Sequence, residues 1–361
     1  MTANGGPPGG SGDVVVALDV GGTGMKCALV RPDGTVVHAE RHATDAGRGP
    51  DAVVGTVLDV AEGLAGTARA AGLTPVACGV VVPGVVDEAT GTAVWSANVG
   101  FRDVPLRELV ATRLGRPAVL GHDVRAGGLA EARLGAGRGA AHVLFVAIGT
   151  GIAAAHVVDG RAATGAHGAA GEIGHILVRP DGPTCGCGRP GCLEAVASAA
   201  AVARRYAELA GTPAALHGAP QPTRSDGTPE PVGTNGTPQP AATPEPVGAA
   251  GGRLSAANVA TLAAAGDPLA GRVWREAVEA LADGLATGQA LFDVSTVVLG
   301  GGLARAGSLL FDPLRAALRD RLTFHREPRL VPAALGDQAG CLGAALLALD
   351  ARRETALALD D

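Results

Sequence analysis

Two segments of the sequence repeat one pattern, in which an apolar run ends at a turn of small residues and a second apolar run follows at once. The first copy runs from Val14 to Asp19, turns at Gly21-Gly22-Thr23 and continues from Lys26 to Val30. The second copy runs from His142 to Ile148 and turns at Gly149-Thr150-Gly151. Apolar runs joined this closely predict buried strands paired as hairpins, not a strand followed by a helix. Because the copies lie about 130 residues apart, we expect two similar α/β halves that face each other across a cleft.

The composition agrees with an α/β protein of two domains. The 361 residues include 47% hydrophobic residues, 2% aromatic residues and 56 glycines, which predicts a core of small aliphatic side chains and many tight turns. A net charge of −6 provides no basic field for nucleic acid, and no apolar run is long enough to span a membrane. The N-terminal residues lack the features of a secretion signal, so we expect a cytoplasmic protein whose cysteines are thiols or metal ligands.

Changes in composition along the chain predict its domain organisation. Residues 1–12 are predicted to form a disordered tail, and residues 212–252, which contain TPEPVG twice, a disordered insertion. The expected domains are a small α/β domain over 13–121, completed by a C-terminal helix at 340–361, and a large α/β domain over 122–339. Apolar spacing predicts further strands over Val76–Val82 and Val294–Leu299 and helices over Asp51–Ala71, within Ala256–Gln289 and over Gly340–Arg352.

Three glycine turns follow predicted strands, and each could bring backbone amides close to phosphate oxygens. Glycine permits this approach because it has no side chain, and Thr23 adds a hydroxyl donor. Asp19 stands at the end of its strand, where a carboxylate can hold Mg²⁺ directly or through water. The third cluster is Gly300-Gly301-Gly302. A single glycine-rich hairpin is more often only a turn, and the sequence has neither a P-loop nor a dinucleotide fingerprint.

Four metal-binding side chains lie close together between residues 175 and 192. His175, Cys185, Cys187 and Cys192 follow the spacing H-x9-C-x-C-x4-C. One imidazole and three thiolates form a closed tetrahedral set for structural Zn²⁺, and the intervening glycines allow tight turns. Free thiols are the alternative, whereas a C-x-C spacing does not match a thioredoxin-type redox pair. The remaining three cysteines stand alone in apolar surroundings and are predicted to be small core residues: Cys27, Cys78 and Cys341.

The motifs together resemble the sugar kinases of the ROK family (repressors, open reading frames and kinases), in particular its bacterial ATP-dependent glucokinases. The resemblance covers nearly the whole chain outside the 212–252 insertion, and the E-x-G-H and C-x-C-G-x-x-G-C patterns make it specific. It implies a two-domain actin-like, ribonuclease-H-like fold with an interdomain cleft. The matching segments are DVGGTGMK (Asp19–Lys26), the segment around Asp123, IGTGI (Ile148–Ile152), GEIGH (Gly171–His175), CGCGRPGCLE (Cys185–Glu194) and LGGGLA (Leu299–Ala304).

The resemblance implies a role for particular residues in phosphoryl transfer to a sugar. Asp123 matches the aspartate that removes the proton from the attacking hydroxyl, although without the resemblance the N-cap of a helix over Val124–Arg133 would be the favoured interpretation. The residues that match the family's sugar-binding positions are Gly84, Asn98, His122, Asp123, Glu172, His175 and Glu194. The residues that match its binding sites for ATP and Mg²⁺ are Asp19, Gly21, Gly22, Thr23, Lys26, Gly149, Thr150, Gly151, Gly300, Gly301 and Gly302.

The sequence departs from the family pattern at two places near these positions. The family usually has Asn-Asp-Ala-Asn around the aspartate, where this chain has His122-Asp123-Val124-Arg125. An inward Arg125 would lower the pKa of Asp123, and an outward one would point to solvent. The family prefers three glycines after the second turn, where Ala153-Ala154-Ala155 could crowd the nucleotide.

The predicted function is ATP-dependent phosphorylation of a hexose at its primary 6-hydroxyl, with glucose favoured. The alternatives are a kinase for another hexose or an N-acetylated amino sugar, and a catalytically weak regulator that binds sugar. A sugar-responsive repressor is less favoured, because only eighteen residues precede Asp19 and they are rich in glycine and proline. The expected partners are the sugar and ATP, with neither nucleic acid nor a membrane, and the resemblance implies a homodimer or homotetramer.

Overall fold

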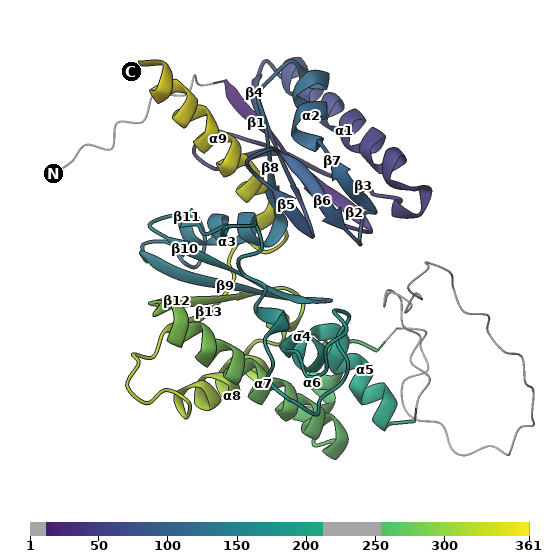
Figure 1. Cartoon of the computed structure of the whole chain (residues 1–361), viewed down its shortest axis with the longest axis vertical. Coiled ribbons are helices and arrows are strands. Elements are labelled where there is room, and N and C mark those ends of the chain that lie inside the picture. The colour runs from purple at the N-terminus through teal and green to yellow at the C-terminus, as the bar shows by residue number, and fades with distance from the viewer. Residues whose placement is uncertain (1–11, 212–253, 361) are drawn as a thin grey trace, which may run out of the picture.

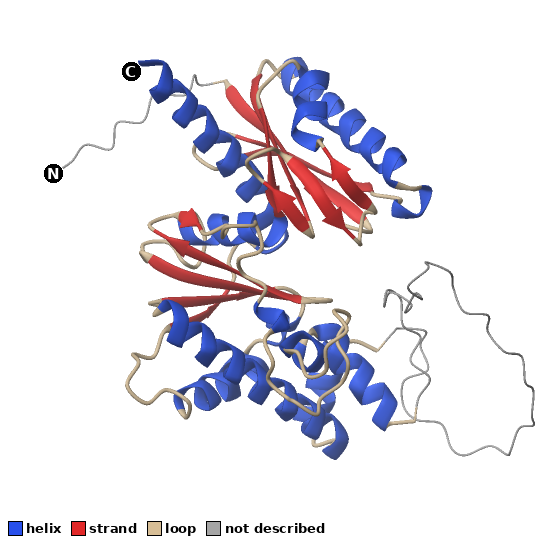
Figure 2. Ribbon diagram, in the orientation of Figure 1, coloured by secondary structure: helices blue, strands red, loops and turns tan. Residues whose placement is uncertain are grey.

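Two five-stranded mixed sheets with the same topology form the framework of the chain. Figures 1 and 2 show one sheet in the upper part of the molecule and the other in the lower part. The computed structural model describes residues 12–211 and 254–360. The predicted insertion at 212–252 and, except for Gly12, the predicted tail at 1–12 lie outside the described residues. In each sheet a three-stranded antiparallel meander is extended by two parallel strands. The repeated pattern of strand, glycine turn and strand therefore predicted the basic unit of the fold correctly.

The first sheet has the order β3-β2-β1-β4-β8. Its strands are β1 (Asp13–Val20), β2 (Gly24–Val30), β3 (Val36–Ala43), β4 (Thr74–Val82) and β8 (Ala118–His122). Side chains of β1 alternate between two cores: Val14, Val16 and Leu18 face α1 (Pro50–Ala70) and α2 (Leu106–Leu114), whereas Val15 and Ala17 face α9 (Ala339–Asp360). Burial on both faces explains why this strand is apolar at nearly every position.

The second sheet has the order β11-β10-β9-β12-β13. Its strands are β9 (His142–Ile148), β10 (Ile152–Val158), β11 (Arg161–Ala162), β12 (Thr296–Gly300) and β13 (Arg329–Pro332). One face carries the largest hydrophobic core, which is built with the helices α4 (Leu193–Ala197), α5 (Ala199–Leu209), α6 (Ala256–Ala264), α7 (Pro268–Phe292) and α8 (Ser308–Arg319). The other face packs on α3 (Asp123–Arg133).

The helices α3 and α9 lie between the two sheets (Figure 1). Ala126 and Ala130 of α3 belong to the core shared with α9 and the first sheet, whereas Ala132 belongs to the core of the second sheet. The predicted two-lobed α/β architecture is confirmed, with α3 as the element that both lobes share. Within the described residues, no helix is long and apolar enough to cross a membrane.

Some elements differ from the sequence-based expectation. A third sheet, β5 (Val85–Asp87), β6 (Thr92–Ser96) and β7 (Phe101–Val104), was not predicted, because its strands are too short to show a periodic pattern. The C-terminal helix runs from Ala339 to Asp360, which agrees with the segment 340–361 expected to complete the first domain; it extends beyond Arg352, where the apolar spacing ended, since no glycine or proline interrupts it there. Short 3₁₀ turns complete the chain: η1 (Ala46–Arg48), η2 (Ile173–His175), η3 (Leu303–Ala306) and η4 (Gly336–Gln338).

Candidate functional site

Four carboxylates from four different elements influence one another electrostatically. Asp19 lies near the end of β1, Asp123 begins α3, Glu172 precedes η2 and Glu194 lies in α4. Burial raises the pKa of Asp19 to about 6, and the negative charge of Asp123 adds to this rise. Burial also raises the pKa of Glu172, and the charges of Glu194 and Asp123 contribute. The fold thus brings together the carboxylates that the sequence analysis predicted to bind Mg²⁺, to accept the proton of the hydroxyl and to bind the sugar.

Asp123 is held at the junction of β8 and α3. Its side chain is 29% exposed, and its Oδ1 accepts a hydrogen bond from the Val124 amide at 2.7 Å. The N-cap of α3 is not Asp123 but His122, whose Nδ1 accepts the Arg125 amide at 3.4 Å. Burial raises the pKa of the Asp123 carboxyl despite this amide and the nearby Arg125. The carboxylate therefore has one oxygen available for a ligand.

The two charged or titratable neighbours of Asp123 have specific surroundings. Burial lowers the pKa of His122 to about 4, and Arg125 adds to the effect, so the imidazole is neutral near pH 7. Arg125 is 3% exposed and forms an ion pair with Glu88 at 2.8 Å. Of the two orientations considered from the sequence, the inward one is therefore found: the charge of Arg125 lowers the pKa of Asp123, although burial outweighs this effect.

The first glycine turn is braced by the end of β3. The Gly21 amide donates to the Gly24 carbonyl at 3.0 Å, and the buried Thr44 hydroxyl donates to the Gly21 carbonyl at 2.6 Å. Lys26 Nζ lies 3.5 Å from Asp19 Oδ2, so the cation and the carboxylate share one side of the turn. Sequence reasoning missed Thr44, because a threonine after a strand has no distinguishing pattern.

Asn98 and Gly84 lie in the connections around the three-stranded sheet of the first lobe. A side chain at Gly22 would meet the backbone carbonyl of Asn98, so the two segments are in contact. Gly84, between β4 and β5, has a φ of +105°, and a side chain there would collide with the Trp95 carbonyl. Both predicted sugar-site positions therefore lie in the first lobe, and Asn98 is in contact with the first glycine turn.

The second and third glycine turns lie side by side in the second lobe. Strands β9 and β12 are parallel neighbours, and both end here. A side chain at Gly301 would collide with the backbone of Ile148, which shows how closely the two turns pack. The Gly149 amide donates to the Gly151 carbonyl at 2.9 Å. The first turn belongs to the other lobe, so the predicted phosphate contacts come from both sheets.

The three alanines after the second turn are part of the packed strand β10. Ala154 is 3% exposed and lies in the core on the side of α7, whereas Ala155 is fully buried in the core on the side of α3. Alternation along a strand places Ala153 on the same face as Ala155. Two of the three methyl groups therefore fill hydrophobic cores.

The four predicted metal ligands form one compact cluster. One ligand atom from each of His175, Cys185, Cys187 and Cys192 lies within 4.8 Å of all the others. His175 Nδ1 is 3.6 Å from Cys185 Sγ, and the Cys187 and Cys192 sulfurs are 3.6 Å apart. The Arg189 backbone amide lowers the pKa of the Cys187 thiol to about 6. The donor set and its spacing fit Zn²⁺.

His175 connects this cluster to the carboxylates. Its Nδ1 faces the sulfur atoms, while its Nε2 lies 3.9 Å from Glu172 Oε2. On the other side, Cys185 Sγ lies 3.8 Å from Glu194 Oε1. The predicted metal cluster and the predicted sugar-binding carboxylates are thus in contact. The isolated cysteines Cys27, Cys78 and Cys341 are buried, as expected for core residues.

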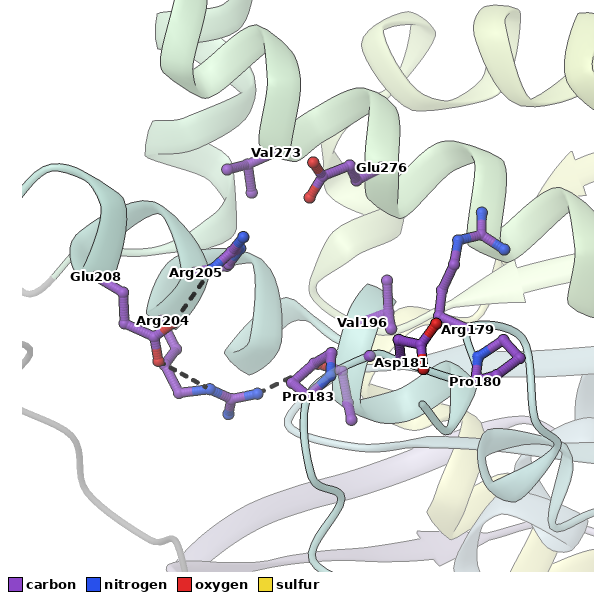
Figure 3. Close-up of a pocket in the computed structure, with 12 residues that line it drawn as sticks. Arg179, Pro180, Asp181, Pro183, Val196, Arg204, Arg205, Glu208, Val273 and Glu276 are labelled. Atoms are coloured by element: carbon purple, nitrogen blue, oxygen red, sulfur yellow. Dashed lines mark hydrogen bonds and ion pairs between the residues drawn. The ribbon is translucent and has the colours of Figure 1, made fainter. Parts of the chain in front are cut away.

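A pocket of about 520 Å³ lies between residues 179–183, α5 and α7 (Figure 3). Three arginines line it, but Arg179 pairs with Asp283 at 2.6 Å, and Arg204 and Arg205 both lie within 4 Å of Glu208. The pocket contains none of the predicted catalytic or sugar-binding residues. With its arginines paired, it gives no sign of the chemistry of a ligand.

Comparisons with known proteins place these features in a family. The chain is 31% identical to a glucokinase of Streptomyces coelicolor over 338 residues, which cover 93% of this chain and 97% of that protein. A ROK hexokinase of Thermus thermophilus superposes with a TM-score of 0.76 at 31% identity, over 94% of this chain and 99% of that one. A ROK family glucokinase of Streptomyces griseus, solved in complex with glucose and AMPPNP, has a TM-score of 0.69 at 29% identity, over 93% of this chain and 99% of that one.

The family pattern itself extends over nearly the whole chain. It matches residues 15–351, which include both sheets, the shared helix α3 and the metal cluster. The chain therefore belongs to the ROK family.

Proposed function

We propose that this chain transfers the γ-phosphoryl group of ATP to the primary 6-hydroxyl of a hexose, with glucose as the preferred acceptor. The observation that carries the proposal is the convergence of Asp19, Asp123, Glu172 and Glu194 from four elements of both lobes. Such a group of carboxylates can hold a metal, accept a proton and bind vicinal hydroxyls. The full-length similarity to glucokinases supports the same activity.

On the acceptor side, Asp123 is the proposed base. It would accept the proton of the sugar hydroxyl as that oxygen attacks phosphorus, and its raised pKa brings it nearer to the range in which a general base is effective. Glu172, Glu194 and His175 Nε2 would hold the other sugar hydroxyls. The remaining proposed sugar contacts are Gly84, Asn98 and His122.

On the donor side, the three glycine turns would bind ATP through backbone amides. The proposed phosphate-binding residues are Gly21, Gly22, Thr23, Lys26, Gly149, Thr150 and Gly151, and Gly300, Gly301 and Gly302 would lie beside the nucleoside. Asp19 would hold Mg²⁺, which neutralises charge on the phosphates during transfer. Phosphoryl transfer of this kind depends mainly on positioning and electrostatics, which two lobes can supply together.

Zinc is proposed as a structural ion held by His175, Cys185, Cys187 and Cys192. Four protein ligands complete a tetrahedral coordination shell and leave no position for a substrate. The residues of the cluster fix His175 and the start of α4, and so orient Glu172 and Glu194. The proposed role of the cluster is therefore to shape the sugar site.

A coupled assay with ATP and a panel of sugars tests the proposed function. Glucose should give the highest kcat/KM among glucose, mannose, fructose and N-acetylglucosamine. A preference for mannose, fructose or N-acetylglucosamine would support the alternative sugar kinases. Binding of glucose without turnover of any sugar would identify a regulator, and the changes at His122 and Arg125 are the features that favour this second candidate.

Three further features complete the proposal. The domain limits of 13–121 with 340–361, and 122–339, are supported by the packing of α9 on the first sheet. A cytoplasmic location is supported by the use of cysteines as thiols. The expected assembly is a homodimer or homotetramer, which sedimentation analysis can test.

A further inference from the structure

Arg125 is a buried cation that joins three segments distant in the sequence. Its Nε and Nη2 donate hydrogen bonds to Glu88 Oε1 at 3.0 and 2.8 Å, and its Nη1 donates to the Gly168 carbonyl at 2.8 Å. Glu88 follows β5 in the first lobe, whereas Gly168 belongs to the second lobe. From the first turn of α3, the guanidinium thus connects the two lobes. We call this set of contacts the Arg125 clamp.

The segment that the clamp holds leads directly to a proposed sugar ligand. Gly168 has a φ of +69°, and a side chain there would collide with the Val86 carbonyl. The backbone at Gly168 is therefore in close contact with β5. Three residues later, the Gly171 carbonyl accepts the Ala154 amide of β10 at 2.7 Å. Glu172 follows at once. The backbone that carries this carboxylate is therefore fixed by the first lobe at one point and by the second sheet at another.

The clamp is better suited to fixing geometry than to adding stability. Burying two charges costs solvation free energy that their attraction often only offsets, and an apolar pair of similar volume can be equally stable. The planar guanidinium, however, requires its acceptors to lie at particular positions. Because Glu88 neutralises the cation, Arg125 can stay buried near Asp123 without leaving an uncompensated charge there.

We propose that Arg125 and Glu88 are positioning residues of the phosphoryl-transfer site, which set the location of the Glu172 carboxylate relative to Asp123. This inference rests on the proposed function, because Glu172 matters here as a sugar ligand. The clamp touches neither the glycine turns nor Lys26, so it acts on the acceptor and not on the nucleotide.

The expected kinetic effect is specific to the sugar. A shift of a binding group by about 1 Å can cost about 100-fold in activity, so loss of the clamp should raise the sugar KM by about 10- to 100-fold. The KM for ATP should stay within about twofold, because the glycine turns keep their contacts. This separation distinguishes positioning from general destabilisation, which would lower the amount of active enzyme without changing either KM.

The experiment compares Arg125→Met, Arg125→Lys, Glu88→Gln and the double variant Arg125→Met/Glu88→Met by steady-state kinetics and thermal unfolding. Arg125→Met leaves Glu88, whose side chain is 25% exposed, without its partner and should lower both stability and sugar affinity. The double variant removes both charges, so it should recover stability while the sugar KM remains high. Arg125→Lys keeps the positive charge but lacks the planar guanidinium with its several N–H donors. It should therefore restore the sugar KM only in part.

A matched control lies on the same helix. Arg133 forms a two-bond pair with Asp350 at 3.0 and 2.7 Å and so connects α3 to α9, and its Nε donates to the Gly160 carbonyl at 2.7 Å, ahead of the segment that leads to Glu172. Arg133→Met should leave the sugar KM unchanged. A double variant that regains the wild-type sugar KM, or an equal rise of KM in Arg133→Met, would overturn the positioning role.

The wild-type enzyme separates this inference from the proposed function. Turnover of a hexose by the wild type together with normal sugar KM values in the Arg125 and Glu88 variants would reject the clamp alone. If the wild type neither turns over nor binds any hexose in calorimetry, the proposed function fails and the inference fails with it. If it binds without turnover, the same comparison is made on the calorimetric dissociation constants.

Discussion

The Glu194 carboxylate accepts a hydrogen bond from the backbone amide of Ile152 at 3.0 Å. Ile152 is the first residue of β10 after the second glycine turn, and Glu194 lies in α4 beside the metal cluster. Glu194, which is proposed to bind the sugar, therefore also holds the residue that follows the second glycine turn, which is proposed to bind phosphate. The contact requires glycine at position 151, since a side chain there would reach Glu194 Oε2.

Replacement of Gly151 by alanine should therefore impair the sugar site as well as the phosphate turn. The added methyl group would push the Glu194 carboxylate away from the Ile152 amide. We expect the dissociation constant for glucose, measured by calorimetry without nucleotide, to rise by about tenfold, equivalent to one lost charge-assisted hydrogen bond.

The matched control for this variant is Gly149→Ala in the same turn. A side chain at Gly149 has open space around it within 4 Å, so glucose binding without nucleotide should be unchanged. Equal effects of the two substitutions on glucose binding would show that the Glu194 contact has no role in the sugar site.

The framework of the fold was predictable because it depends on local patterns. The run His142–Ile148 coincides with β9, and Pro50, just before the predicted start of a helix at Asp51, occupies its first position. The strands β5 to β7 could not be predicted, since pairs such as Val85 with Trp95 form only after the chain has folded back on itself. Local periodicity contains no information about such contacts.

The same distinction applies to the candidate site. The metal ligands lie within eighteen residues, so their spacing alone indicated a cluster. The contacts of Arg125 with Glu88 and Gly168 span 37 and 43 residues, and neither partner belongs to a recognisable motif. Sequence reasoning could therefore identify Arg125 as unusual but could not find the charge that neutralises it.

Asp123→Asn should lower kcat by about 100- to 10,000-fold, because the amide cannot accept the hydroxyl proton. The dissociation constant for glucose should change by less than about threefold, since asparagine is nearly isosteric and still accepts hydrogen bonds. Rapid-quench measurement of product formation, combined with calorimetry, separates the two effects. Asp159→Asn, the same change in the exposed turn between β10 and β11, serves as the control, and a near-normal rate in Asp123→Asn would remove this residue from the proton transfer.

Cys187→Ser should abolish stoichiometric zinc binding, because one of four ligands is lost. Elemental analysis of the purified protein measures the zinc content, and thermal unfolding should show a lower Tm. The sugar KM should also rise, because without the metal the cluster no longer fixes Cys185, which contacts both His175 and Glu194. The matched control is Cys78→Ala, which alters a buried thiol in the first lobe and should retain zinc. Unchanged zinc content in Cys187→Ser would refute this ligand set.

His122→Asn should reduce the loss of stability on acidification. Burial lowers the pKa of the folded-state imidazole from 6.5 to about 4, so between these values the unfolded chain binds the proton more tightly than the folded one. The free energy of unfolding therefore falls as the pH drops from 6.5 toward 4. Between pH 7 and pH 5 this histidine accounts for a loss of about 2 kcal/mol, which the variant should not show. Asparagine is also a good N-cap, so α3 keeps its first turn. Urea unfolding at the two pH values measures the difference, and an equal loss in both proteins would mean that His122 is protonated in the folded state at pH 5.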